Sequence, residues 1–186
     1  MRKYKEDKMN YDSTEETMKH KNKVNDNIAE LLESLEIRKS THDNSKLLDP
    51  EKKIFDEVTP KLKGLTYGSP EYKEQLFSMG EALSHHYSAN RHHPEHFRDG
   101  LRDMNLVDVV EMFCDWCAAT ERHEDGSIGE SIARQEEKLG FDKNLSGIFL
   151  STSQDYKLGK NHENARKEYL NYKKSKQGDN NDNSKL

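Results

Sequence analysis

The stretch LVDVVEMFCDWCAA, residues 106–119, decides the fold of this chain. Projected as a helix, it carries apolar side chains around most of its circumference, which is typical of a helix buried at the centre of a bundle. Asn105 stands before it as a cap, so we predict a helix from Leu106 to about Glu121. Three acids share one narrow sector of this helix: Asp108, Glu111 and Asp115. Buried acids are costly unless paired or bound to metal. The sector is therefore either a solvent-facing acidic strip or a set of ligands.

The sequence on either side predicts further helices. Ser13 and Glu16 form a capping box that opens a helix to about Arg38. Its apolar positions predict one buried stripe, made of Val24, Ile28, Leu31, Leu32 and Leu35. Further helices are expected after Pro50, from Pro70 to about His92, from Ser127 to Leu139 with Gly140 closing it, and over residues 141–150. No period-2 strand pattern occurs. We predict an all-α fold, a single-domain helical bundle.

Composition sets the domain limits. A chain of 186 residues fits one domain. Because 35% of the residues are charged and 31% hydrophobic, we expect compact helices with solvated outer faces. We predict a flexible leader over residues 1–12, a helical domain over 13–153, and a polar, largely disordered C-terminal tail over 154–186.

The charge and the apolar runs exclude several classes of protein. A net charge of -5 and a pI near 6.0 argue against general nucleic-acid binding. No apolar run approaches the roughly 18 residues of a membrane helix, so we expect a soluble cytoplasmic protein with small-molecule or protein partners. Cys114 and Cys117 have the C-x-x-C spacing of redox or zinc sites. Their position inside a helix instead favours small buried side chains, since redox pairs use helix N-termini.

The pair His42-Asp43, in the string THDNSK, is the main candidate for chemistry. An adjacent imidazole and carboxylate on one turn can bind the same divalent cation. His20 lies upstream on the first predicted helix, and His86, His92 and His93 lie downstream. Nitrogen and oxygen ligands without thiolate suit magnesium, manganese, iron or a related ion better than a closed structural zinc site.

In the order of these residues the chain resembles the HD-domain metal-dependent phosphohydrolases. The resemblance rests on a histidine on the first core helix, then the His-Asp pair, then an aspartate on a central helix, here Asp115 or Asp108. Lys46 stands where many members carry a lysine. His92-His93-Pro94-Glu95 and Asp99-Gly100 are similar to elements of the cyclic-dinucleotide phosphodiesterase branch. However, Ser45 replaces a common glycine, Pro94 interrupts His-His-Glu, and no Gly-Tyr-Pro follows Asp99-Gly100, so that specificity is not carried over.

The resemblance implies a bundle in which His20, His42, Asp43 and Asp115 ligate one divalent ion, with manganese, magnesium, iron, cobalt or nickel as candidates. His86 with His92 or His93 would hold a second ion or the substrate phosphate. Lys46 and Arg91, the latter beside Asn90, would bind the phosphate. Glu95 would act as general acid or base. Asp108 would orient a ligand histidine. The implied substrate is a small phosphorylated molecule such as a nucleotide.

Residues 13–153 also resemble an uncharacterised family of small proteins from low-GC bacteria and their phages. The shared segments are Asn-Arg-His-His-Pro-Glu and Cys-Asp-Trp. If the chain is encoded by a phage, the host cytoplasm is its compartment. Two other functions fit the same residues. One is a non-catalytic binding module on the same scaffold, and the other is oxygenase chemistry like that of a di-iron branch of the superfamily.

Overall fold

A computed structural model describes residues 11–66, 69–122 and 124–182. The predicted leader therefore lies mostly outside the described residues. Over the described ranges the chain forms helices and no strands, which confirms the all-α prediction. The α-helices are α1 (Thr14–Thr41), α2 (Glu51–Leu62), α3 (Pro70–Ser78), α4 (Gly80–Ala89), α5 (Leu106–Thr120), α6 (Ile128–Leu139), α7 (Lys143–Tyr156) and α8 (Ala165–Asp182). Short 3-10 helices cover Asn44–Leu47, Pro94–His96, Gly100–Asp103 and His162–Asn164. Within the described ranges, no helix has both the length and the hydropathy that a membrane-spanning segment requires.

The chain divides into two compact units, residues 1–40 and residues 41–186. The first unit carries α1 almost to its end. Within this unit most of the predicted apolar stripe on α1 is uncovered, with Ile28 at 51% and Leu32 at 57% of their full accessibility, while Leu35 is half-buried. Taken by itself, the described part of this unit holds one helix, and a stripe is buried only when a second element packs against it.

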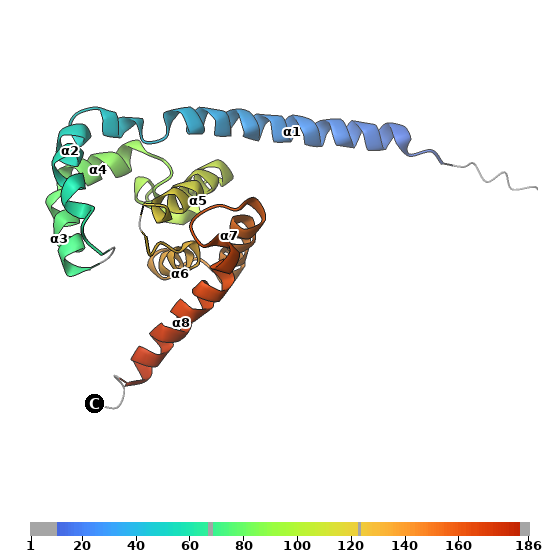
Figure 1. The fold of residues 1–186 in the computed structure, drawn as a ribbon. Helices are drawn as coiled ribbons and strands as arrows, with labels where there is room; N and C mark the ends of the chain where they lie inside the picture. Colours follow the sequence, from blue (N-terminus) through green and yellow to red (C-terminus); the bar gives the residue numbers. More distant parts are fainter. Residues whose placement is uncertain (1–10, 67–68, 123, 183–186) are drawn as a thin grey trace, which may run out of the picture. The chain divides into compact units, whose positions relative to one another are not determined.

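The second unit is built around α5, as the apolar stretch predicts. Its core joins residues of α5 to residues of α6, α7 and α8. In Figure 1 α6 and α7 lie beside α5, and α8 starts next to α6 and α7 and extends away from them. Phe113 of α5 stacks on Phe149 of α7 with ring centroids 4.9 Å apart, and Trp116 meets the same ring edge-on. Asn105 forms the capping box of α5 with Asp108. Asp108 and Glu111 are buried, so the acidic sector of α5 is not a fully solvated strip.

The single helix predicted from Pro70 to about His92 is wrong in its length. The chain forms α3 and α4, separated at Met79, and α4 ends at Ala89. Gly80 directly follows the break, and glycine propagates a helix poorly. Asn90 adopts an extended backbone and donates its side-chain amide to the carbonyl oxygen of His86, which satisfies a free carbonyl at the end of α4.

The prediction of a largely disordered tail from residue 154 also differs from the structure. α7 continues to Tyr156, and α8 packs against α6. Ala165 is fully buried and Tyr169 is 8% exposed. The sequence signal for α8 is weak because few of its residues are apolar. The helix is held by tertiary contacts at its first turns, which composition does not reveal.

Glu136 of α6 ties these helices together through its carboxylate. It accepts hydrogen bonds from Ser146 of α7 and Tyr169 of α8, and Lys173 lies 3.2 Å away. Burial raises the pKa of Glu136, but these donors outweigh burial and hold the pKa below its ordinary 4.5. A carboxyl group with a depressed folded pKa stabilises the fold above its unfolded pKa. That contribution is lost as the pH falls through the folded pKa.

We therefore expect Glu136→Gln to lower the free energy of unfolding by about 1–2 kcal/mol at pH 7, since it removes the charge from three hydrogen bonds. The difference from the wild type should shrink as the pH drops below 4.5 and the wild-type carboxyl group protonates. Urea denaturation from pH 7 down to pH 3 measures it. An equal difference at both ends of this range would contradict the charge-based explanation.

Candidate metal centre

Asp43 is the centre of a cluster of histidines and acids in the second unit. It follows α1 and precedes the 3-10 helix Asn44–Leu47, and its backbone is left-handed, with φ 57° and ψ 15°. Aspartate tolerates this conformation better than most residues. Its Oδ2 accepts a 2.6 Å hydrogen bond from Nζ of Lys46. Its Oδ1 is buried and has no hydrogen-bond partner within the described ranges.

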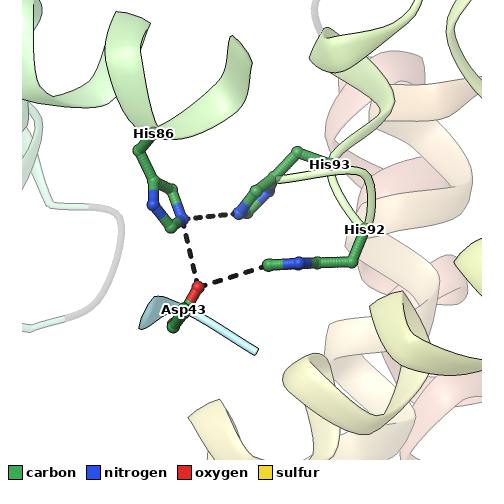
Figure 2. A group of neighbouring side chains, drawn as sticks. All are labelled: Asp43, His86, His92 and His93. Carbon is green, nitrogen blue, oxygen red and sulfur yellow. Dashed lines mark hydrogen bonds and ion pairs between the residues drawn. The ribbon is translucent and has the colours of Figure 1, made fainter. Parts of the chain in front are cut away.

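Three imidazoles gather on the Oδ1 side of Asp43 (Figure 2). Nε2 of His86 lies 3.4 Å from Oδ1, and Nε2 of His92 lies 3.6 Å from it. Nε2 of His93 is 2.8 Å from Nε2 of His86. The Nε2 atom of His92 is also buried without a hydrogen-bond partner in the described part of the chain. Buried polar atoms are nearly always paired, so this group of four has the character of a cation site.

A second set of ligand atoms lies on the Oδ2 side. Nε2 of His42 is 3.6 Å from Oδ2 of Asp43 and 3.8 Å from Oδ1 of Asp115. His42, Asp43 and Asp115 therefore form a second group whose ligand atoms could hold one ion. Asp43 belongs to both groups, and its two carboxylate oxygens face the two sets separately.

Two buried carboxylates fix the orientation of these imidazoles. Glu51, at the start of α2 and fully buried, lies 2.9 Å from Nδ1 of His86 and 2.7 Å from Nδ1 of His85. Glu111 of α5 lies 2.9 Å from Nδ1 of His42 and 3.3 Å from Nδ1 of His92. When Nδ1–H of a neutral imidazole donates to a carboxylate, the lone pair is on Nε2, which is the atom that faces Asp43 in His42, His86 and His92. Carboxylates commonly hold metal-binding histidines in this way.

The electrostatics of the cluster favour a cation. Hydrogen bonds to Asp115 and Glu111 raise the pKa of His42 to about 10, so its ring is protonated at neutral pH and a metal ion would displace the proton on Nε2. Burial raises the pKa of Asp43, but the hydrogen bond and charge of Lys46 outweigh it and lower the pKa, so this carboxylate stays ionised. Burial and the neighbouring His92 and His86 lower the pKa of His93 to about 3. Asp43 and His93 thus have the protonation states that metal binding requires, and His42 would release a proton when it binds a metal ion.

The structure thus brings six of the seven predicted ligands together: His42, Asp43, His86, His92, His93 and Asp115. The seventh, His20, lies exposed on α1 in the first unit, and its role as a ligand stays a prediction. Of the two aspartates considered for the central helix, Asp115 is the one in a candidate metal group. Cys117 is buried and burial raises its pKa to about 12, whereas Cys114 is exposed. A thiol with so high a pKa is unsuited to redox exchange.

The predicted substrate and helper residues have other contacts. Arg91 donates from Nε and Nη2 to Asp108 at 3.0 and 2.8 Å, so a role on phosphate requires this pair to open. Asp108 also accepts from the backbone N–H of Asn105. Asn90 donates to Oγ of Ser45, beside its bond to the end of α4. Lys46 bonds to Asp43, as described above, and Glu95 pairs with Lys138 at 2.9 Å.

Sequence reasoning missed Glu51 and treated Glu111 only as a member of the acidic sector. Glu51 follows Pro50 at a helix start, where acids are common for reasons of helix capping alone. Its link to two histidines more than thirty positions away is visible only in three dimensions.

We expect Glu51→Gln to weaken metal binding by about 10–100-fold, the usual cost of losing an outer partner of a ligand histidine. The amide offers one acceptor oxygen, so it cannot hold both Nδ1–H groups. Isothermal titration with Mn²⁺ measures the affinity, and the visible spectrum of the Co²⁺-loaded protein reports the ligand geometry. Glu57→Gln, at an exposed acid of the same helix that pairs with Lys61, is the matched control. Unchanged affinity and an unchanged spectrum in Glu51→Gln would contradict this role.

Comparison with known proteins identifies a family for this chain, but that family has no known activity. Residues 9–159 match the model of a family of unknown function (DUF5662). Among curated proteins and among solved structures, none matches the chain.

Proposed function

The chain belongs to the family of unknown function DUF5662, and we propose that it is a divalent-metal-dependent phosphohydrolase of the HD type. The observation that carries this proposal is Asp43, whose two carboxylate oxygens face two sets of ligand atoms from distant parts of the chain. Two such sets sharing one carboxylate suit one or two divalent ions. The resemblance of His42-Asp43 and Asp115 to the HD pattern supports the same function.

The ligand chemistry is consistent with the group that the resemblance implies. Imidazole nitrogens and carboxylate oxygens suit manganese, iron, cobalt, nickel and, with more oxygen ligands, magnesium. Asp43, His86, His92 and His93 would hold one ion, and His42, Asp43 and Asp115 the other. A bound divalent ion lowers the pKa of water and neutralises charge on phosphoryl oxygens.

The chain's own residues have defined tasks in this proposal. Lys46 provides a positive charge beside Asp43, where it would bind a phosphoryl oxygen after exchanging its present partner. Glu51 and Glu111 keep the imidazoles in the tautomer that presents Nε2. Glu95, with a pKa lowered mainly by Lys138 against the effect of burial, is ionised and would accept a proton.

We propose a small phosphate ester, with nucleotides included, as the substrate. We also propose the cytoplasm as the compartment, because both Cys114 and Cys117 are free thiols and a reducing environment keeps them so.

Metal analysis combined with a hydrolysis screen tests the function. The purified protein is analysed for bound metals, stripped with a chelator and reloaded separately with Mn²⁺, Fe²⁺, Co²⁺, Ni²⁺ and Mg²⁺. Release of phosphate is then measured from nucleotides and sugar phosphates. We expect stoichiometric metal and release that disappears on chelation. Metal binding without any release would overturn the hydrolase in favour of the binding module. Failure to bind metal would overturn both the centre and the activity.

A further inference from the structure

We propose that a cavity beside the metal centre holds the alcohol part of the substrate and selects phosphate esters that carry a planar heteroaromatic ring. This inference rests on the proposed function for the position of the phosphate. It adds the chemistry of the rest of the substrate, which the metal centre leaves open.

The cavity adjoins the candidate metal centre. It has a volume of about 360 Å³, and its lining includes His93 and Asp115, one residue from each ligand group. Pockets for small molecules usually measure about 300–1,000 Å³. The cavity therefore fits one small molecule, and a phosphate at the metal centre would have its ester group in this space.

Aromatic side chains from three helices line the cavity. Tyr72 comes from α3, Tyr87 from α4 and Trp116 from α5. Both tyrosines are half-buried, so part of each is accessible. The ring of Tyr87 lies 4.9 Å from the ring of His93, which puts this aromatic surface next to the metal centre. Aromatic walls favour a flat ring, because a planar heteroaromatic ring can stack on their faces.

Polar side chains of α6 favour a ligand ring that has hydrogen-bonding atoms on its edge. Ser131 and Gln135 line the same cavity and are half-buried. A hydroxyl group and a carboxamide offer both donors and acceptors. A purely hydrocarbon ring would leave them unpaired against an apolar surface, which is unfavourable. The preferred ring therefore carries nitrogen or oxygen atoms on its edge.

Two probes with the same phosphate and sugar isolate the contribution of the ring. Adenosine 5′-monophosphate carries a heteroaromatic ring, and ribose 5-phosphate carries none. Trp116 is the only tryptophan of the chain and lines the cavity, so its fluorescence reports binding without requiring turnover. In the metal-loaded full-length protein, rapid-mixing titrations should give at least about 10-fold tighter binding of adenosine 5′-monophosphate.

Tyrosine variants test the location. Tyr87→Leu and Tyr72→Leu should each reduce the preference for adenosine 5′-monophosphate and leave the affinity for ribose 5-phosphate within about 2-fold. Tyr156→Leu, at a tyrosine of α7 that is 73% exposed, is the matched control. Thermal melting of each variant establishes that the fold is retained, and two independent positions guard against the loss of one variant.

The outcomes separate this inference from the proposed function. Equal affinity for both probes, or a preference that survives both cavity variants, overturns the ring-binding cavity even if phosphate is released from both. If the wild type prefers adenosine 5′-monophosphate and the cavity variants lose this preference, the result supports ring binding in the cavity. This holds even if neither probe is hydrolysed, an outcome that would count against the hydrolase activity alone. If neither adenosine 5′-monophosphate nor ribose 5-phosphate binds to the metal-loaded protein, the inference is overturned.

Discussion

The Asp43→Asn variant is expected to lose metal binding while keeping its fold. Asp43 belongs both to the group with His86, His92 and His93 and to the group with His42 and Asp115. Replacing its carboxylate by a neutral amide therefore weakens metal binding by both groups. We expect the affinity for Mn²⁺ to fall by more than about 100-fold, beyond the cost of losing an outer partner. Asparagine suits this position because, like aspartate, it tolerates a left-handed backbone, here φ 57°. Elemental analysis and metal titration of the two proteins measure the effect.

Asp56→Asn is the control for this variant. Asp56 accepts a 2.6 Å bond from Lys52 on the exposed face of α2, as Asp43 does from Lys46. Both substitutions remove a lysine–aspartate pair, and exposed pairs contribute only about 0–1 kcal/mol. Only Asp43→Asn removes a carboxylate from the ring of imidazoles. If both variants retain metal equally, the centre described above is not a metal site.

Gly129→Ala is expected to destabilise the packing of α6 against α8 strongly. A Cβ at Gly129 of α6 would lie 2.1 Å from the carbonyl oxygen of Ala165, at the start of α8. The obstacle is backbone, so one of the two helices must move. Forcing an extra methyl group into such a contact costs about 1–3 kcal/mol or more. Urea denaturation and protease cleavage within α8 measure the loss.

Gly147→Ala, also at a helical glycine, is expected to raise the free energy of unfolding where Gly129→Ala lowers it. Gly147 lies inside α7, and an added Cβ meets no atom of the described residues within 4 Å. Alanine should therefore stabilise the protein by roughly 0.5–1 kcal/mol, since glycine is the poorer helix former. If the two alanine variants shift stability in the same direction, close α6–α8 packing is not what position 129 requires.

Local sequence patterns predicted the helices of this protein well where the pattern lies within a few neighbouring residues. The apolar circumference of residues 106–119 predicts α5, and the caps Ser69, Asn105 and Ser127 begin α3, α5 and α6 as expected. Gly140 ends α6 in the left-handed conformation that glycine favours. Such signals depend on contacts within one turn of helix, so the sequence contains them completely.

For the metal centre, the sequence predicts most of the ligands but not the residues that orient them. Residue chemistry selected His42-Asp43, the downstream histidines and an acid of α5, because few side chains can bind a divalent ion. It did not find Glu51, since nothing in the local sequence separates an orienting carboxylate from a helix-capping one. Nor did it find the break at Met79 or the packing of Ala165 and Tyr169 that holds α8.

The sequence by itself determined the all-α class, the starts of most helices and the types of side chain able to bind a cation. These properties follow from helical periodicity, capping and the donor atoms of single residues. Only the tertiary structure decided that both oxygens of Asp43 face histidines, that Glu51 and Glu111 orient those histidines, and that a cavity adjoins them. Each of these depends on distances between residues separated by tens of positions, and such distances are set by how the helices pack.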